Sequence, residues 1–221
     1  MMPCIEIPIQ GLILQKFRVH NITSHLSLES NMCNRPKVII VEGPDRVGKD
    51  SLIKRLSEHF NNQVKVIHAG IPTSKDLYSY YYDGLLHDTL DAYYSHKFNV
   101  IIHNRSIYGE YVYGTKYRNE NPDEIKTLIS KLEVGQLKSF ILNSDLYLVL
   151  LTCDDVSTLL KNDDGLSISS KQSDIENEIS LFNDIFEIST IKNKFKVTVN
   201  SGNTFKSKDD IYKSVINFIE N

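Results

Sequence analysis

Residues 38–54 read Val-Ile-Ile-Val-Glu-Gly-Pro-Asp-Arg-Val-Gly-Lys-Asp-Ser-Leu-Ile-Lys, and this stretch predicts the fold. Residues 38–41 are β-branched, which is typical of a strand buried on both faces. Gly43 to Lys49 then match the spacing G-x-x-x-x-G-K, and apolar residues recur at helical spacing over residues 52–60. A strand, this loop and a helix predict phosphate binding, because the glycines let backbone N–H groups point inward, the helix start adds partial positive charge and Lys49 adds a full charge. The alternative is a tight turn in which Lys49 is merely solvated.

The rest of the chain alternates between predicted strands and predicted helices. Four more strands are expected at residues 64–67, 98–102, 146–151 and 195–199, and further helices at residues 75–96, 122–132, 175–186 and 211–219. Strands separated by helices predict an α/β three-layer sandwich, in which a mainly parallel five-stranded sheet carries helices on both faces. In such a sheet the ligand lies beyond the carboxyl ends of the strands.

The composition is that of an ordinary globular chain. Its 221 residues are 41% hydrophobic and 24% charged, the formal net charge is −3, and no run of 18 or more apolar residues occurs. A protein that binds long nucleic acid through its backbone usually has a basic excess, so we expect small-molecule partners, no extended nucleic-acid surface and no membrane span. Cys4, Cys33 and Cys153 show no metal-binding spacing, which favours a reducing, cytoplasmic compartment and no structural zinc.

Residues 1–35 differ from the rest of the chain because they show no clean hydrophobic period. We expect a poorly ordered N-terminal extension there, followed by one folded domain over residues 36–221. Local basic residues such as Lys16 and Arg18 leave organelle targeting by residues 1–30 open as an alternative.

The residue after Lys49 departs from the usual phosphate-loop motif. That position normally holds Ser or Thr as a ligand of Mg²⁺, whereas this chain has Asp50 followed by Ser51. Two interpretations remain open. Asp50 and Ser51 hold Mg²⁺ directly or through water, since Mg²⁺ prefers oxygen ligands, or Asp50 only stabilises the helix start.

Residues 41–49, Val-Glu-Gly-Pro-Asp-Arg-Val-Gly-Lys, resemble the P-loop of thymidylate kinases, a family of P-loop NTPase fold. The resemblance implies that Asp45 holds the sugar hydroxyl of the acceptor nucleotide and that Arg46 stabilises the transferring phosphoryl group. It also implies ATP as the donor and Mg²⁺ as a cofactor. The residues expected to bind them are Gly43, Pro44, Asp45, Arg46, Val47, Gly48, Lys49, Asp50 and Ser51.

A second resemblance covers residues 104–118, Asn-Arg-Ser-Ile-Tyr-Gly-Glu-Tyr-Val-Tyr-Gly-Thr-Lys-Tyr-Arg. It is similar to the Asp-Arg-Ser/Tyr/His signature of thymidylate and deoxynucleoside kinases, and its continuation is especially like phage-encoded deoxynucleotide kinases. Arg105 then binds the acceptor phosphate, for which its fork suits bidentate recognition, and Arg118 could serve the same anion. Tyr113 and Tyr117 are expected to contact the base or sugar. The alternative is an amphipathic helix whose tyrosines pack on the core.

Asn104 is a second departure, because the resembled signature has a carboxylate there. One hypothesis is that Asp50 supplies the missing charge within one metal site. The other is a degenerate, weakly active site.

Residues 66–72, Val-Ile-His-Ala-Gly-Ile-Pro, close the second predicted strand without any Asp or Glu. A kinase that phosphorylates a hydroxyl benefits from a base there, whereas an acceptor phosphate is already anionic. This absence favours a monophosphate acceptor, although His68 could act as a base or be an ordinary strand-end histidine. Residues 161–173 are rich in turn formers and charge, and predict either a mobile lid over the triphosphate or a plain polar loop.

Together these features predict an ATP- and Mg²⁺-dependent kinase of nucleotide biosynthesis that phosphorylates a deoxynucleoside monophosphate, dTMP or a related dNMP. Arg46, Lys49 and Arg105 are the expected catalytic residues. The alternatives are a kinase of a hydroxyl acceptor, either a deoxynucleoside or a modified base in DNA, and a catalytically weakened nucleotide-binding protein. Thymidylate kinases are often dimers, so a homodimer is possible.

Overall fold

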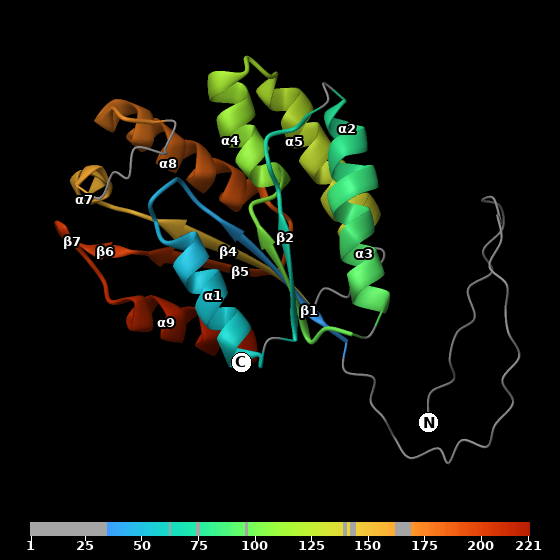
Figure 1. Ribbon diagram of the computed structural model, residues 1–221. Helices are drawn as coiled ribbons and strands as arrows, with labels where there is room; N and C mark the ends of the chain where they lie inside the picture. Colours follow the sequence, from blue (N-terminus) through green and yellow to red (C-terminus); the bar gives the residue numbers. More distant parts are fainter. Residues whose placement is uncertain are drawn as a thin grey trace, which may run out of the picture. The chain divides into compact units, whose positions relative to one another are not determined.

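Five short apolar runs of the sequence form one parallel sheet in the order β2-β3-β1-β4-β5 (Figure 1). The computed structural model describes residues 35–61, 63–73, 76–95, 97–138, 141, 145–161 and 169–221. The strands are β1 (Lys37–Glu42), β2 (Val64–His68), β3 (Val100–Asn104), β4 (Leu146–Thr152) and β5 (Asn193–Thr198). The predicted parallel five-stranded α/β fold is confirmed.

Helices cover both faces of the sheet. Helices α1 (Lys49–His59) and α9 (Lys208–Glu220) pack on one face, and α3 (His87–Tyr94), α4 (Ile107–Tyr117), α5 (Pro122–Ser130) and α8 (Gln172–Ile188) pack on the other (Figure 1). Successive side chains of a strand point to opposite faces. Ile39 and Val41 of β1 therefore belong to the α1/α9 core, and Val38 and Ile40 belong to the core on the opposite face.

The central position of β1 decides where the site lies. Its partners are β3 and β4, so the chain leaves β1 at the point where the strand order reverses direction. A loop at this switch point opens into the crevice between neighbouring crossovers, which is where parallel α/β sheets bind ligands. The loop after β1 and the loop after β3 therefore meet at the same edge of the sheet.

Several elements differ in detail from the predictions. The expected helix over 75–96 consists of α2 (Leu77–Ser79), a π-helical segment η1 (Tyr80–Leu86) and α3, and α5 continues into a second π-helical segment, η2 (Lys131–Leu137). The short α7 (Val156–Leu160) and the antiparallel pair β6 (Asn200–Ser201) and β7 (Thr204–Phe205) were not predicted. These pieces are too short to produce a hydrophobic period.

Two expectations fall on parts of the chain that lie outside the described residues. They concern the N-terminal extension, of which residues 1–34 are not described, and the lid, of which residues 162–168 are not described. Both stay predictions. Of the helices that the structure does describe, none has the length and apolar character needed to cross a membrane.

Candidate active site

The glycine loop between β1 and α1 has the backbone that its sequence predicts. Gly43 (φ 142°) and Gly48 (φ 86°) both adopt positive φ, which costs a glycine little. A Cβ at Gly43 would clash with the carbonyl oxygen of Leu151 in β4. Glycine is thus required at residue 43 both by conformation and by the close approach of the neighbouring strand.

Lys49 is held inside this loop. Its side chain is buried, and its Nζ donates to the carbonyl oxygens of Gly43 (2.9 Å) and Pro44 (2.5 Å). Burial, followed by the nearby positive charge of Arg105, lowers the pKa of Lys49 to about 7. Asp45 opposes this shift without cancelling it. A polyphosphate in the loop would supply the negative charge that restores the charged form of Lys49.

Arg105 joins the glycine loop to the segment after β3. It follows β3 directly with φ 68°, and its guanidinium forms an ion pair with Asp45 of the loop. The same guanidinium lies over the ring of Tyr113 in α4, 4.8 Å from the ring centroid. Asp45 and Arg105 are 60 residues apart in the sequence, and the fold brings them into contact.

Two buried polar atoms at this junction have no hydrogen-bond partner among the described residues. They are Nη1 of Arg105 and the hydroxyl of Tyr113. Burial raises the pKa of Tyr113, so its hydroxyl stays protonated and able to donate. Buried donors without acceptors are unusual in a native structure. A bound phosphate would satisfy both.

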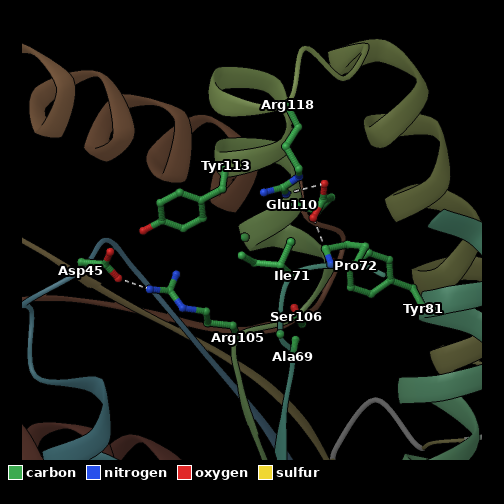
Figure 2. Close-up of a pocket in the computed structure, with 12 residues that line it drawn as sticks. Asp45, Ala69, Ile71, Pro72, Tyr81, Arg105, Ser106, Glu110, Tyr113 and Arg118 are labelled. Carbon is green, nitrogen blue, oxygen red and sulfur yellow. Dashed lines mark hydrogen bonds and ion pairs between the residues drawn. The ribbon is translucent and has the colours of Figure 1, made fainter. Parts of the chain in front are cut away.

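A cavity of about 250 Å³ opens beside Arg105 (Figure 2). Asp45, Arg105, Ser106 and Tyr113 line it nearest the glycine loop, while Ile71, Pro72, Tyr81, Glu110 and Arg118 lie farther along it. The cavity therefore extends from the phosphate-binding loop to a partly apolar region walled by the segment after β2. We call it the acceptor pocket.

An ion pair that the sequence did not reveal lies at the far end of the acceptor pocket. Arg118 donates from Nη2 to Oε1 of Glu110 at 2.6 Å, and the hydroxyl of Tyr81 donates to Oε2 at 3.1 Å. A Cβ at Gly114 would clash with the Glu110 carboxylate, so the glycine leaves room for it. The sequence hinted at this ion pair only through Gly114, which follows the acidic Glu110 by one helical turn.

Tyr117 does not line the acceptor pocket, in contrast to the prediction that it contacts base or sugar. Its hydroxyl donates to Oε1 of Glu178 in α8 at 2.5 Å and lies 2.5 Å from the hydroxyl of Ser169. Although Tyr117 is one turn after Tyr113, it reaches α8 instead of the pocket. The carbonyl of Ser169, in the segment just before α8, in turn accepts from Nη2 of Arg46 at 2.9 Å, so this contact links the glycine loop to that segment.

Comparison with known proteins places these features in a family. Residues 18–133, just over half of the chain, match the family model described as Polyphosphate kinase 2 (PPK2). The chain belongs to the PPK2 family. The match contains the whole glycine loop and the β3–α4 segment, which are the two parts that meet at the Asp45–Arg105 ion pair. No curated protein matches the chain.

Solved structures agree on the fold. YorR of Bacillus subtilis, solved in complex with phosphorylated GDP, is 19% identical with a TM-score of 0.57, and the alignment covers 83% of this chain and 95% of that one. Thymidylate kinase of Candida albicans is 15% identical (TM-score 0.51; 84% and 92% covered), and Polyphosphate Kinase 2 of Arthrobacter aurescens TC1 is 10% identical (TM-score 0.54; 84% and 66% covered). The family match identifies a kinase, and these structures agree with it on the P-loop fold. The specific likeness to thymidylate kinases is one of fold.

The two residues that depart from the usual motifs lie together in this PPK2-family chain. Nδ2 of Asn104 donates to Oδ1 of Asp50 at 2.7 Å and lies 3.2 Å from Nδ1 of His68. Asp50 is exposed in the first turn of α1. Within the described residues, no group of three or more His, Cys, Asp or Glu side chains could hold a metal ion. The available oxygens, from Asp50 and Ser51, suit Mg²⁺, which binds through one or two protein ligands together with phosphates and water.

A second cavity, of about 500 Å³, lies on the α1 side of the P-loop. It has three basic side chains, those of Arg46, Lys206 and Lys208, and an apolar part that includes Phe205 and Ile211. Phe205 is 37% exposed, and its ring is therefore accessible to a ligand in this cavity. This cavity, which we call the donor cavity, can accept an anionic chain that extends away from the P-loop, with or without an aromatic base.

Proposed function

We propose that this protein transfers the γ-phosphoryl group of ATP to the phosphate of a deoxynucleoside monophosphate, giving the diphosphate. The observation that carries the proposal is the Asp45–Arg105 ion pair at the junction of the P-loop and the acceptor pocket. It puts a polyphosphate-binding loop and a second set of anion-binding donors side by side. Phosphoryl transfer requires this arrangement, because protein catalysis of the step consists largely of positioning and charge stabilisation.

Each of the contacts described above then has a role. Lys49 and the loop amides hold the donor phosphates, and Arg46 stabilises the charge that develops on the transferring group. Arg105 and the Tyr113 hydroxyl bind the acceptor phosphate, while Asp45 orients Arg105 and faces the sugar. Asp50 and Ser51 would hold Mg²⁺, which neutralises phosphate charge when bound.

The end of β2 supports a phosphate acceptor over a hydroxyl acceptor. Residues 66–72 contain no carboxylate, and His68 is engaged by the side chain of Asn104. Asp45, the acidic residue at the glycine-loop end of the acceptor pocket, is paired with Arg105. A hydroxyl acceptor would need a free base to take its proton, whereas a nucleoside monophosphate would not.

A second candidate concerns the donor and is favoured by the family match. The family is described as polyphosphate kinases, so inorganic polyphosphate is an alternative to ATP. Arg46, Lys206 and Lys208 of the donor cavity would suit a chain of phosphates, and Phe205 would suit an adenine ring. If polyphosphate is the donor, the basic side chains of the donor cavity should contribute to its binding. If ATP is the donor, Phe205 should contribute to binding of the adenine ring.

A matrix assay tests both proposals with the full chain. ATP and polyphosphate are each offered with the four dNMPs and with thymidine, and product diphosphate is separated by ion-exchange chromatography. We expect a dNMP to be phosphorylated and thymidine to be unchanged. Turnover of thymidine alone, or binding of dNMPs without turnover by either donor, would refute the proposed acceptor.

Matched arginine variants connect the activity to the site. Arg105→Met should lower kcat/KM for the dNMP by about 100-fold or more, because a charge-assisted fork to phosphate is removed. Arg55→Met is the control, since Arg55 pairs with Asp209 on an exposed surface of α1. Equal losses of kcat/KM in both variants would show that Arg105 does not bind the acceptor.

The metal hypothesis has its own comparison. Asp50→Ala should raise the Mg²⁺ concentration needed for half-maximal activity, because a carboxylate ligand is lost. Asp88→Ala, at an exposed first-turn position of α3, is the control. An unchanged Mg²⁺ requirement in Asp50→Ala would show that Asp50 is not a ligand of Mg²⁺.

A further inference from the structure

The far end of the acceptor pocket carries a second arginine, remote from the P-loop. Figure 2 shows Asp45 and Arg105 at one end of the pocket and Arg118 with Glu110 at the other, with Ile71 and Pro72 between them. A nucleotide whose phosphate lies at Arg105 would extend toward Arg118. The part of the ligand that reaches Arg118 is then the base.

The contacts of Arg118 hold its guanidinium in one orientation. Glu110, whose side chain is 2% exposed, accepts from Nη2 of Arg118, whose own side chain is 27% exposed. Tyr81 holds the other oxygen of the same carboxylate. An arginine has five N–H donors in a planar fork, so this one pairing leaves donors for a ligand in the pocket.

The surroundings of Arg118 suit a base better than a phosphate. Ile71 and Pro72 offer apolar surface beside it, and a planar neutral ring can pack against such surface. Glu110 neutralises the charge of Arg118, and its carboxylate would lie close to any anion bound there. The Arg105 end differs, because the positive charge of Lys49 lies near Arg105 there. A phosphate at this end would therefore meet repulsion that an uncharged base avoids.

We propose that Arg118, oriented by Glu110, reads the purine C6 or pyrimidine C4 position of the acceptor's base and selects a carbonyl there, as in guanine and thymine, over an amino group there, as in adenine and cytosine. Guanine O6 and thymine O4 are hydrogen-bond acceptors, whereas the amino groups of adenine and cytosine are donors. The arginine guanidinium carries only hydrogen-bond donors. An amino group that faces it would therefore place two donors against each other without an acceptor. This inference rests on the proposed nucleoside monophosphate acceptor.

The test compares kcat/KM for dTMP, dGMP, dCMP and dAMP in the wild type and in Arg118→Lys. Discrimination by an arginine fork at a base edge corresponds to about 5- to 150-fold. We expect the wild type to favour the two carbonyl bases by a factor in this range. Arg118→Lys keeps the charge but has a single nitrogen. When that nitrogen pairs with Glu110, no second nitrogen is left to reach the base, so the variant should reduce this preference to a few-fold or less while the amino bases change little.

The controls separate base recognition from other roles. Arg55→Lys, which makes the same replacement in a remote ion pair with Asp209, should leave all four values unchanged. An equal loss for all four dNMPs in Arg118→Lys would show a phosphate contact and overturn the inference, as would a wild type that favours dAMP or dCMP. Arg118→Gln, which keeps one donor for Glu110, repeats the comparison if the lysine variant fails to fold.

Failure of the proposed function gives a different pattern. If no dNMP is turned over, calorimetric binding of the same four nucleotides decides. Tighter binding of dTMP and dGMP that is lost in Arg118→Lys would support base selection without the kinase assignment. Equal binding of all four, or none, would overturn the inference.

Discussion

The buried position of Lys49 predicts that donor binding takes up a proton. In the ligand-free protein its pKa is lowered to about 7 by burial, with Arg105 adding repulsion. At pH 8 about nine-tenths of the Lys49 side chains are therefore neutral. The phosphates of a bound donor favour the charged form, so binding raises the pKa and draws a proton from solution.

The expected magnitude follows from the titration curve. At pH 8 binding of ATP without acceptor should take up about 0.9 proton, and at pH 6 about 0.1, because Lys49 is already charged there. The apparent Kd should rise as the pH rises above 7, by up to about 50-fold between pH 7 and pH 9, since protonating Lys49 then opposes binding. Isothermal titration calorimetry in two buffers of different ionisation enthalpy measures the proton uptake directly.

Lys49→Arg is the matched variant, because a guanidinium stays protonated throughout this range. Its ATP binding should show no proton uptake at pH 8. If the variant does not bind ATP, the pH dependence of the wild-type Kd remains as the readout. A wild-type Kd that is constant from pH 7 to pH 9, with no buffer dependence at pH 8, would show that Lys49 is charged in the free protein and refute the reasoning.

Two further predictions concern stability. Gly43→Ala should lower the free energy of unfolding by more than about 2 kcal/mol, since it combines a strained φ with a clash against the Leu151 carbonyl, and a loss below 1 kcal/mol in urea titrations would contradict this. Glu178→Gln should cost about 1–3 kcal/mol, because the buried carboxylate accepts from Tyr117 and bridges α4 and α8. Glu176→Gln, on the exposed side of α8, should leave the free energy of unfolding nearly unchanged. Similar losses of this free energy in both variants would contradict the role given to the buried Glu178 carboxylate.

The predicted site residues divide according to how local their interactions are. Gly43, Gly48 and Lys49 act within one loop, and their backbone conformation and placement follow from the motif between a strand and a helix. Tyr113 and Tyr117 share one face of α4, with ring centroids 6.3 Å apart, and the resemblance of this segment to deoxynucleotide kinases assigned both of them to the base or sugar. The structure separates them because α8 meets Tyr117 and the pocket meets Tyr113.

The sequence by itself determined the parallel α/β sheet and the phosphate loop, since hydrophobic period and glycine placement act over a few residues. Only the tertiary structure decided that Asp45 meets Arg105, that burial lowers the pKa of Lys49 and that Glu110 holds Arg118 at the far end of the acceptor pocket. The pairings across the pocket and the burial of Lys49 depend on how separate elements pack. Packing fixes distances and solvent exposure that no local spacing encodes.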